Sequence, residues 1–231
     1  MGRGAQLQVL VTDLRAEIGH STTTNLGVNM LDSLKQVLSR TQDRLWADYD
    51  WPFLRSTSDK QLAAGSRYYD IPQTFVLERI ESVHVKDGGN WSILSPGISL
   101  NEYNVYDSDA GDRLSPVLKW EPYGTSQIEV WPLPDANGVT STLEGYIRFT
   151  GIKNLSQLVS DTDTADLDDR LIVLHAAAEF LARQGAKDAD AKFQLAQLHY
   201  KRLKARLSTK RRFSMSDAAV RPQEKLTAKR I

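Results

Sequence analysis

The acidic stretch DTDTADLDD is the part of the sequence whose residue types come closest to a metal site. A calcium-binding EF-hand loop needs an oxygen ligand at its fifth position, glycine at its sixth and glutamate at its twelfth. Counted from Asp161, those positions hold Ala165, Asp166 and Ile172. We therefore predict that these acids cap the helix that follows, where carboxylates accept free N–H groups near its positive end. Residues 107–112 are also rich in aspartate without the required glutamate, and predict a solvated turn.

The histidines and glycines form no enzyme motif. His20, His84, His175 and His199 are scattered along the chain, and no HExxH pair places two imidazoles on one helical face. The sequence contains no GxGxxG, no Walker loop and no GxSxG. His175 and His199 could meet across a helical hairpin, but without a nearby third ligand a polar contact is favoured over a metal site. We predict a protein that is not an enzyme, with no cofactor and no metal.

Composition narrows the class of protein. The chain has 231 residues, of which 25% are charged and none is cysteine, so disulfides, thiolate metal sites and a cysteine nucleophile are excluded. No apolar run is long enough for a signal peptide or a membrane span, so we expect no membrane association. The formal net charge of zero conceals an asymmetry. Residues 201–231 hold eleven Lys and Arg against two acids, whereas residues 1–200 hold eighteen against twenty-seven.

Two apolar stripes predict two helices in the first 50 residues. The first stripe is Leu7, Val11, Leu14 and Ile18. Gly19 supplies its C-cap, because glycine adopts a left-handed conformation without steric cost. The second helix begins near Asn29, and its stripe is Leu31, Leu34, Leu38, Thr41, Leu45 and Tyr49. It must end near Asp50, because Pro52 lacks an N–H and disfavours helical geometry at Trp51.

Between residues 53 and 150 the sequence changes to short runs rich in β-branched and aromatic residues, separated by Gly, Pro, Asn and Asp. Residues 86–90, KDGGN, predict a hairpin turn. In IEVWPLP, alternation places Ile128, Val130 and Pro132 on one face. We expect a mostly antiparallel sheet, curled into a sandwich or a small barrel, with one helical turn in SLNEYNVYD.

Helical periodicity returns in the last third of the chain. One stripe is Leu167, Leu171, Leu174, Ala178 and Leu181, and the next is Ala189, Phe193, Ala196, Tyr200, Leu203 and Leu207. The short turn at Gly185 between them predicts an antiparallel helical hairpin. The residues after Ser208 form no stripe, and we predict that this tail is disordered by itself.

The order of elements predicts an α+β fold. The simplest arrangement is a discontinuous helical bundle, with two N-terminal and two C-terminal helices, an inserted antiparallel β sandwich or barrel, and a flexible C-terminal tail. The predicted boundaries are 1–50 and 155–208 for the helical domain, 51–154 for the β-rich domain and 209–231 for the basic tail.

The stretch LWADYDWPFL lies at the first of these boundaries. It contains four aromatic residues in ten, namely Trp46, Tyr49, Trp51 and Phe53. A sugar-binding platform would need their ring faces exposed, whereas a structural joint would bury them as rigid wedges between the bundle and the sheet. Pro52 ends the second helix, and Phe53 and Leu54 are expected to begin the first strand run. We favour the joint.

The basic tail has three interpretations. Lysines and arginines neutralise phosphate, which favours nucleic-acid binding. The tail lacks the interleaved aromatic residues of a single-strand binder, because Phe213 is its sole aromatic. It could instead remain solvated, or it could fold against an acidic partner protein. The residues by themselves leave these three open.

Four blocks resemble the head-to-tail adaptor (connector) proteins of tailed phages, of the kind related to podophage tail tubular protein A. They are RLWADYDWPFL, GSRYYDIPQTFVLERIESVHV, QIEVWPLPDA, and DTDTADLDDRLIVLHAAAEFLARQGAKDADAKFQLA. The likeness covers residues 7–208 and is a pattern across blocks without an invariant motif. The strongly basic end, KLTAKRI, departs from it.

The resemblance implies a structural virion protein in the neck between capsid portal and tail, assembled in the host cytoplasm. It implies a homo-oligomeric ring, twelvefold, that binds the portal protein and a tail or nozzle protein. Genomic DNA would pass through its channel without sequence specificity. It also implies that the C-terminal segment docks into the portal. On that basis we expect portal contacts from Lys210, Arg211, Arg212, Phe213 and Met215.

Two other functions remain as alternatives. One is a nucleic-acid-binding protein that grips phosphate with its C-terminal tail. The other is a carbohydrate-binding tail component that uses Trp91, Trp120 and Trp131, which requires that their indole rings be exposed.

Overall fold

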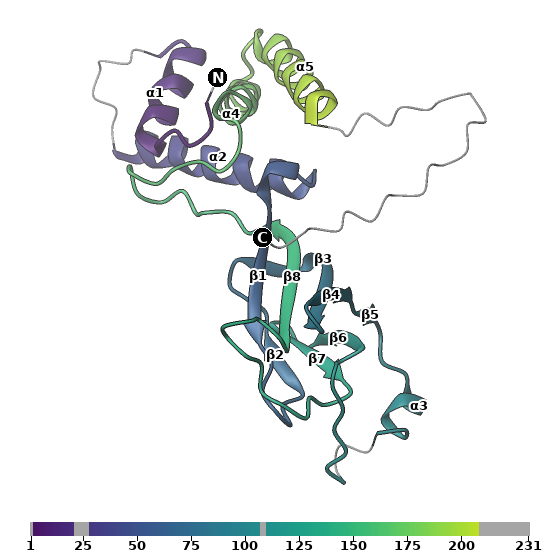
Figure 1. The fold of residues 1–231 in the computed structure, drawn as a ribbon. Coiled ribbons are helices and arrows are strands. Elements are labelled where there is room, and N and C mark those ends of the chain that lie inside the picture. The colour runs from purple at the N-terminus through teal and green to yellow at the C-terminus, as the bar shows by residue number, and fades with distance from the viewer. Residues whose placement is uncertain (1, 21–27, 107–109, 208–231) are drawn as a thin grey trace, which may run out of the picture.

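The computed structural model describes residues 2–20, 28–106 and 110–207 of the chain. The long helices gather at one end of the molecule and the strands, with one short helix, at the other (Figure 1). The chain is mixed α+β, as the sequence predicts. Among the described residues, no helix combines the length and apolar character that crossing a membrane requires.

The first helix agrees with its prediction, and the second begins within one residue of its predicted start but ends three residues before Asp50. α1 spans Leu7–Glu17, and Gly19 follows it with φ +76°. α2 spans Val28–Ala47, so Asn29 lies inside it and Tyr49 lies beyond it. The end comes three residues before Asp50 because the indole Nε1 of Trp51 donates to the Leu45 carbonyl oxygen, 2.9 Å away. A side chain thus satisfies a carbonyl that another helical turn would have used.

The first strand begins later than predicted. Pro52–Leu54 form one 3-10 turn, η1, and β1 spans Arg55–Gln61. The prediction that Phe53 and Leu54 begin the strand run is therefore wrong. β1 has the sequence RSTSDKQ, which contains no apolar residue, yet it pairs along its whole length with β8, Tyr146–Lys153. β1 is therefore stabilised as a strand by its backbone hydrogen bonds to β8, and not by the β-propensity of its own side chains.

The β part consists of two four-stranded sheets. One has the order β1-β8-β3-β4, with β3 at Phe75–Asp87 and β4 at Asn90–Ile93. The other has the order β2-β7-β6-β5, formed by Tyr68–Asp70, Gln127–Trp131, Lys119–Tyr123 and Ser95–Pro96. Every strand pair is antiparallel except β5 with β6. The two sheets share one apolar core, which includes Val83 and Phe149 from the first and Ile128 from the second.

The turns and the short helix of the β part lie where the sequence predicts them. Gly88 and Gly89 join β3 to β4 with φ of +56° and +82°, conformations that favour glycine. α3 spans Leu100–Tyr103, and Ser99 and Glu102 form a capping box at its start.

Strand β7 departs from simple alternation. Ile128 and Val130 are buried as expected, but Glu129 and Trp131 are buried too. The Glu129 carboxylate accepts a hydrogen bond of 2.9 Å from the Tyr103 hydroxyl, and the Arg67 guanidinium lies 3.8 Å away. These partners replace water, so a charged residue is tolerated in a buried position on the strand face that simple alternation assigns to solvent.

The C-terminal hairpin consists of α4, Asp169–Arg183, and α5, Ala189–Leu207. Asp168 caps α4, because its carboxylate accepts the Leu171 N–H at 2.9 Å. α4 is buried on most of its surface, since α1, α2 and α5 all pack against it. The predicted α5 stripe is buried only in part: Ala196 is fully buried, Tyr200 is half-buried, and Phe193 is 52% exposed.

Candidate interaction surfaces

Trp51 is the centre of an aromatic cluster where α2 meets the β part. Its side chain is 1% exposed and belongs to the helical core. The rings of Tyr49, Phe53 and Tyr200 have their centroids 5.1, 5.7 and 5.9 Å from it. Tyr200 comes from α5, so the cluster joins segments about 150 residues apart in sequence. We call these residues, together with Trp46, the junction cluster.

Trp46 and Arg79 connect the end of α2 to two strands. The Trp46 Nε1 donates to the Lys153 carbonyl oxygen at the end of β8, 3.1 Å away. The Arg79 guanidinium, on β3, lies 4.2 Å from the Trp46 ring centroid and donates to the Ala47 carbonyl oxygen at 2.8 Å. It also pairs with the Asp50 carboxylate at 2.7 Å. The indole N–H of Trp46 and both terminal nitrogens of Arg79 therefore have partners on the other side of the boundary.

Two further cations cover the outer aromatic rings of the junction cluster. The Arg3 guanidinium lies 3.5 Å from the Phe53 ring centroid, and the Lys204 ammonium lies 4.5 Å from that of Tyr49. The structure thus brings Trp46, Tyr49, Trp51 and Phe53 together. It stays a prediction that these four residues hold the helical part and the β part in one fixed orientation.

The five residues predicted to contact a portal lie outside the described residues. They are Lys210, Arg211, Arg212, Phe213 and Met215. The described part of the chain ends with α5 at Leu207, directly before them.

The acidic loop of residues 161–169 makes local hydrogen bonds. The Asp163 carboxylate accepts the N–H groups of Val159 and Ser160 at 2.8 and 2.7 Å, and these bonds lower its pKa. The Asp166 carboxylate accepts the Ser156 N–H at 2.6 Å. Across residues 2–20, 28–106 and 110–207, no three His, Cys, Asp or Glu side chains are grouped as a metal site. Capping and turn formation account for these acids.

His175 and His199 have different surroundings. The His199 Nε2 lies 2.8 Å from the Asp168 Oδ1, which ties α5 to the start of α4. His175 is 5% exposed, and its Nε2 has no hydrogen-bond partner. Burial lowers the pKa of His175 to about 4, with a smaller contribution from the nearby Arg44 charge. The imidazole of His175 is therefore neutral at pH 7.

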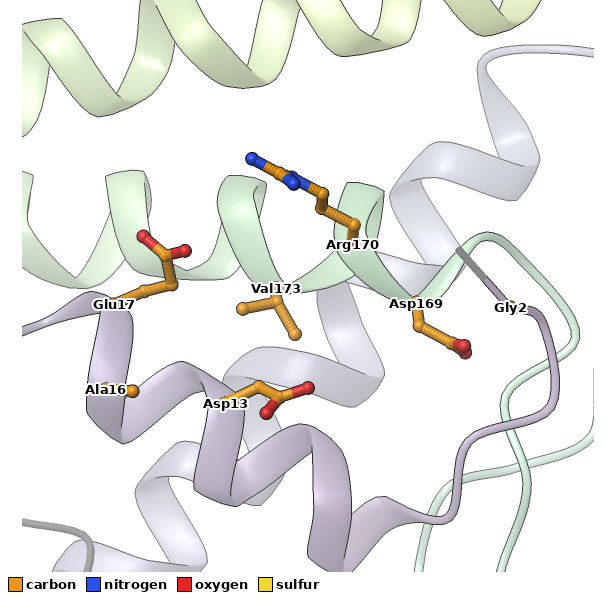
Figure 2. A pocket seen from close by; sticks show the side chains of 7 residues that line it. All are labelled: Gly2, Asp13, Ala16, Glu17, Asp169, Arg170 and Val173. Atoms are coloured by element: carbon orange, nitrogen blue, oxygen red, sulfur yellow. The ribbon is translucent and has the colours of Figure 1, made fainter.

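A groove of about 380 Å³ lies between α1 and the first turns of α4. Figure 2 shows Asp13 on α1 and Asp169 on α4 on either side of it, while Arg170 extends toward α5. Glu17, also in this groove, pairs with Lys192 of α5. Burial raises the pKa of Asp169, and repulsion from Asp168 and Asp13 adds to the increase. We call this the α1–α4 groove; its lining is predominantly acidic.

A second groove, of about 240 Å³, lies between α2, α4 and α5. Ala178, Ala182 and Ala189 give it a small-residue floor. Its other lining residues are Arg44, His175, Glu179, Asp190 and Phe193. We call this the α2–α4–α5 groove. The sequence did not predict this groove. Phe193 lies on the apolar stripe of α5 like its neighbours, and only the fold shows that it is left exposed there.

The three tryptophans of the β part do not present a platform for sugars. Trp131 is buried, and Trp120 packs against the core between the sheets. Trp91 is half-buried, and the Arg148 guanidinium lies 3.9 Å from its ring centroid. A stacking face that a cation already covers is not free to stack on a sugar ring.

Exposed apolar side chains occur together in the segment that runs from β4 through α3 to β6. Ile93, Leu100, Val105 and Leu118 are 68, 83, 65 and 49% exposed. The segment runs along one side of the β part to α3, which lies at the end away from the helices (Figure 1). Exposed apolar surface of this kind is typical of protein contact sites. We call these four residues the distal apolar set.

The sequence model of one protein family, described as the SU10 adaptor protein, matches residues 5–223. No curated protein matches the chain. The matched range begins before α1 and continues past the end of α5, so it includes both helical segments and all strands.

Proposed function

This chain belongs to the SU10 adaptor protein family, and from this premise we propose that it forms a ring beneath the portal of a tailed phage. The family is that of a structural phage adaptor, so the chain is a component of the virion. The observation that carries the proposal is the extent of the match, residues 5–223, which spans nearly all of the described residues and most of the basic segment.

In this role the ring, of twelve copies, supplies the platform to which the tail attaches and the channel through which genomic DNA passes. Residues 1–200 carry twenty-seven acids against eighteen basic residues. A channel lined with negative charge repels phosphate and therefore lets DNA slide without sequence-specific contacts. The protein is made in the host cytoplasm and joins the virion at its neck.

We assign the two ends of the molecule to different partners. The basic segment, with Lys210, Arg211, Arg212, Phe213 and Met215, docks into the portal; it follows α5 directly, at the helical end. The distal apolar set lies in the β part, where α3 carries Leu100 at the end away from the helices, and suits contact with a tail or nozzle protein. In this arrangement residues 1–50 and 155–208 are the helical domain that faces the portal, and residues 51–154 are the β domain that faces the tail.

The junction cluster then has a mechanical role. A ring that is held by the portal at one end and by the tail at the other transmits force through the boundary between its domains. The buried Trp51, the hydrogen bond from Trp46 to Lys153 and the contacts of Arg79 all cross or line that boundary. We propose that they keep the two domains in one fixed orientation.

Electron microscopy of the purified protein, with and without its portal, tests the proposal. We expect rings of the protein on the portal, and loss of these rings when residues 209–231 are deleted while the circular dichroism spectrum stays unchanged. A truncated chain that still decorates the portal would contradict the role of the basic segment. A full-length chain that ignores the portal would contradict the adaptor role as a whole.

Salt dependence separates portal docking from nucleic-acid binding. If the basic segment served to grip phosphate, affinity for DNA would fall steeply with salt and would be lost on the same deletion. We expect weak DNA binding that the deletion changes little. Tight, salt-sensitive DNA binding by the full-length chain alone would favour the nucleic-acid alternative.

A further inference from the structure

The α2–α4–α5 groove is incomplete within a single chain. Phe193 belongs to the α5 stripe that faces α4, yet 52% of it is exposed because it overhangs this groove. His175 lines the same groove, is 5% exposed, and leaves its Nε2 without a hydrogen-bond partner. An unpaired buried polar atom is costly, and a buried group of this kind is usually satisfied by a partner.

Arginine side chains at the rim of this groove have N–H donors that could bind a further carboxylate. Glu179 is the shared partner of Arg40, Arg44 and Arg183. Each guanidinium carries five N–H donors in a fork that suits carboxylates. One carboxylate cannot fill three such groups, and all three arginine side chains are about half-exposed. Asp190 also lines the groove, toward the start of α5.

The outer face of α1 has the complementary character. Val9, Asp13 and Ala16 recur at spacings of four and three on α1, and all three are exposed; Asp13 and Ala16 also line the α1–α4 groove. Val9 is apolar, Ala16 allows close approach, and Asp13 makes no ion pair in the described part of the chain. Such a stripe fits the helix-in-groove mode of recognition.

The two surfaces lie on opposite sides of the helical domain. α4 contributes Asp169, Arg170 and Val173 to the α1–α4 groove, and four other residues to the α2–α4–α5 groove. Because an α-helix advances by about 100° per residue, these two groups point in directions about half a turn apart. α1 packs on the first side and lines the groove there, so its exposed residues lie across the helical domain from the α2–α4–α5 groove of their own chain.

We propose that the α2–α4–α5 groove receives the outer face of α1 from a second copy of this chain. The contact is head-to-tail, because it joins two different surfaces, and a head-to-tail contact closes into a ring when its rotation allows. Val9 and Ala16 cover Phe193 and the alanine floor, while Asp13 faces the arginines that share Glu179. This inference rests on the proposed ring and names the surfaces that build it.

Disulfide trapping tests the contact directly, since the chain has no native cysteine. Val9→Cys or Asp13→Cys is combined in one chain with Ala182→Cys or Ala189→Cys, giving four double variants, and each is oxidised after assembly on the portal. We expect at least one pair to give a covalent ladder of three or more copies, because each chain supplies one cysteine to each neighbour. The matching single variants should give no ladder.

Phe193→Asp and Leu198→Asp form a matched pair for the groove. Both residues lie on α5 and are about half-exposed, but Phe193 lines the groove and Leu198 does not. We expect Phe193→Asp to weaken association between copies at least tenfold, as measured by analytical ultracentrifugation or by ring occupancy on the portal, and Leu198→Asp to leave it unchanged.

The outcomes separate this inference from the adaptor role. Rings on the portal with no ladder from any of the four pairs, or covalent dimers that never extend further, would overturn the head-to-tail contact and leave the adaptor role standing. A larger effect of Leu198→Asp than of Phe193→Asp would also overturn it. Failure of the wild-type chain to bind the portal counts against the adaptor role, and a ladder from the free protein at high concentration would still support the contact.

Discussion

The junction cluster and the α2–α4–α5 groove each include one aromatic ring from α5, Tyr200 and Phe193, yet they differ in how completely one chain satisfies them. At the junction, Trp51 is 1% exposed, and the indole N–H groups of Trp46 and Trp51 donate to backbone carbonyls. At the groove, Phe193 is half-exposed and the His175 Nε2 has no partner. Tyr200 lies between the two regions, because its ring contacts both Trp51 and His175.

This difference separates stability from assembly. Burial and full pairing at the junction mean that its residues contribute to the folding of a single chain. At the groove, the exposed Phe193 ring contributes little to that folding, and both this ring and the unpaired His175 Nε2 are available to another molecule. The predictions below test whether the two regions divide in this way, and stability is measured on monomer at high dilution.

Trp51→Ala should have the largest effect. Removing a fully buried indole leaves a cavity and the unpaired Leu45 carbonyl, so the free energy of unfolding should fall by about 3–5 kcal/mol. Urea denaturation followed by circular dichroism measures the loss. Trp91→Ala is the matched control, because that ring is only half-buried, and it should cost less. Equal losses in the two variants would contradict the claim that the junction cluster contributes more to folding than a half-buried tryptophan does.

Acid should destabilise the chain through His175. Its pKa is about 4 in the folded protein against about 6.5 when unfolded, so the unfolded state binds more protons between these values. The stability that neutral His175 contributes is present above pH 6.5 and is lost as pH falls toward 4, by up to about 3 kcal/mol. Thermal unfolding from pH 7 to 4 should show a steeper loss for wild type than for His175→Gln. Parallel curves would mean that His175 is not the group responsible.

Arg79→Met should have an intermediate effect. The change removes the hydrogen bond to Ala47, the ion pair with Asp50 and the cation over Trp46, and should cost about 1–2 kcal/mol. Arg55→Met is the control, because Arg55 also makes an ion pair, with Glu81, but is half-exposed and should cost less than about 1 kcal/mol. If Arg55→Met lowers the free energy of unfolding as much as Arg79→Met does, the contacts across the boundary stabilise the protein no more than an exposed ion pair.

Phe193→Ala should have the smallest effect on folding. A half-exposed ring on an exposed groove contributes little, so the free energy of unfolding should change by less than about 0.5 kcal/mol. The same urea titration measures it. A loss of 2 kcal/mol or more would show that Phe193 supports the monomer, and would break the contrast between groove and junction.

Much of the fold follows from local pattern. The predicted stripe residues Leu7, Val11 and Leu14 of α1 and Leu171, Leu174 and Ala178 of α4 are buried, and the Gly88–Gly89 hairpin, the helical turn at α3 and the capping of α4 by Asp168 are as predicted. Each depends on helical periodicity or on the chemistry of neighbouring residues, which a sequence shows directly.

The errors occur where a distant segment decides the outcome. β1 is a polar strand because β8 pairs with it, and α2 ends early because Trp51 folds back onto Leu45. Glu129 is buried because Tyr103 and Arg67 reach it from outside its strand. None of these partners lies at a spacing that periodicity reveals.

The sequence by itself determined the order of the helices and strands, the faces of α1 and α4 that are buried, and the aromatic residues of the junction cluster, because these depend on residue type and spacing along the chain. Tertiary structure alone decided that Phe193, on an apolar stripe like the others, stays exposed, and that His175 is buried without a partner. The physical reason is that α5 packs against α4 but leaves the space toward α2 unfilled, and such a space depends on how three helices are arranged.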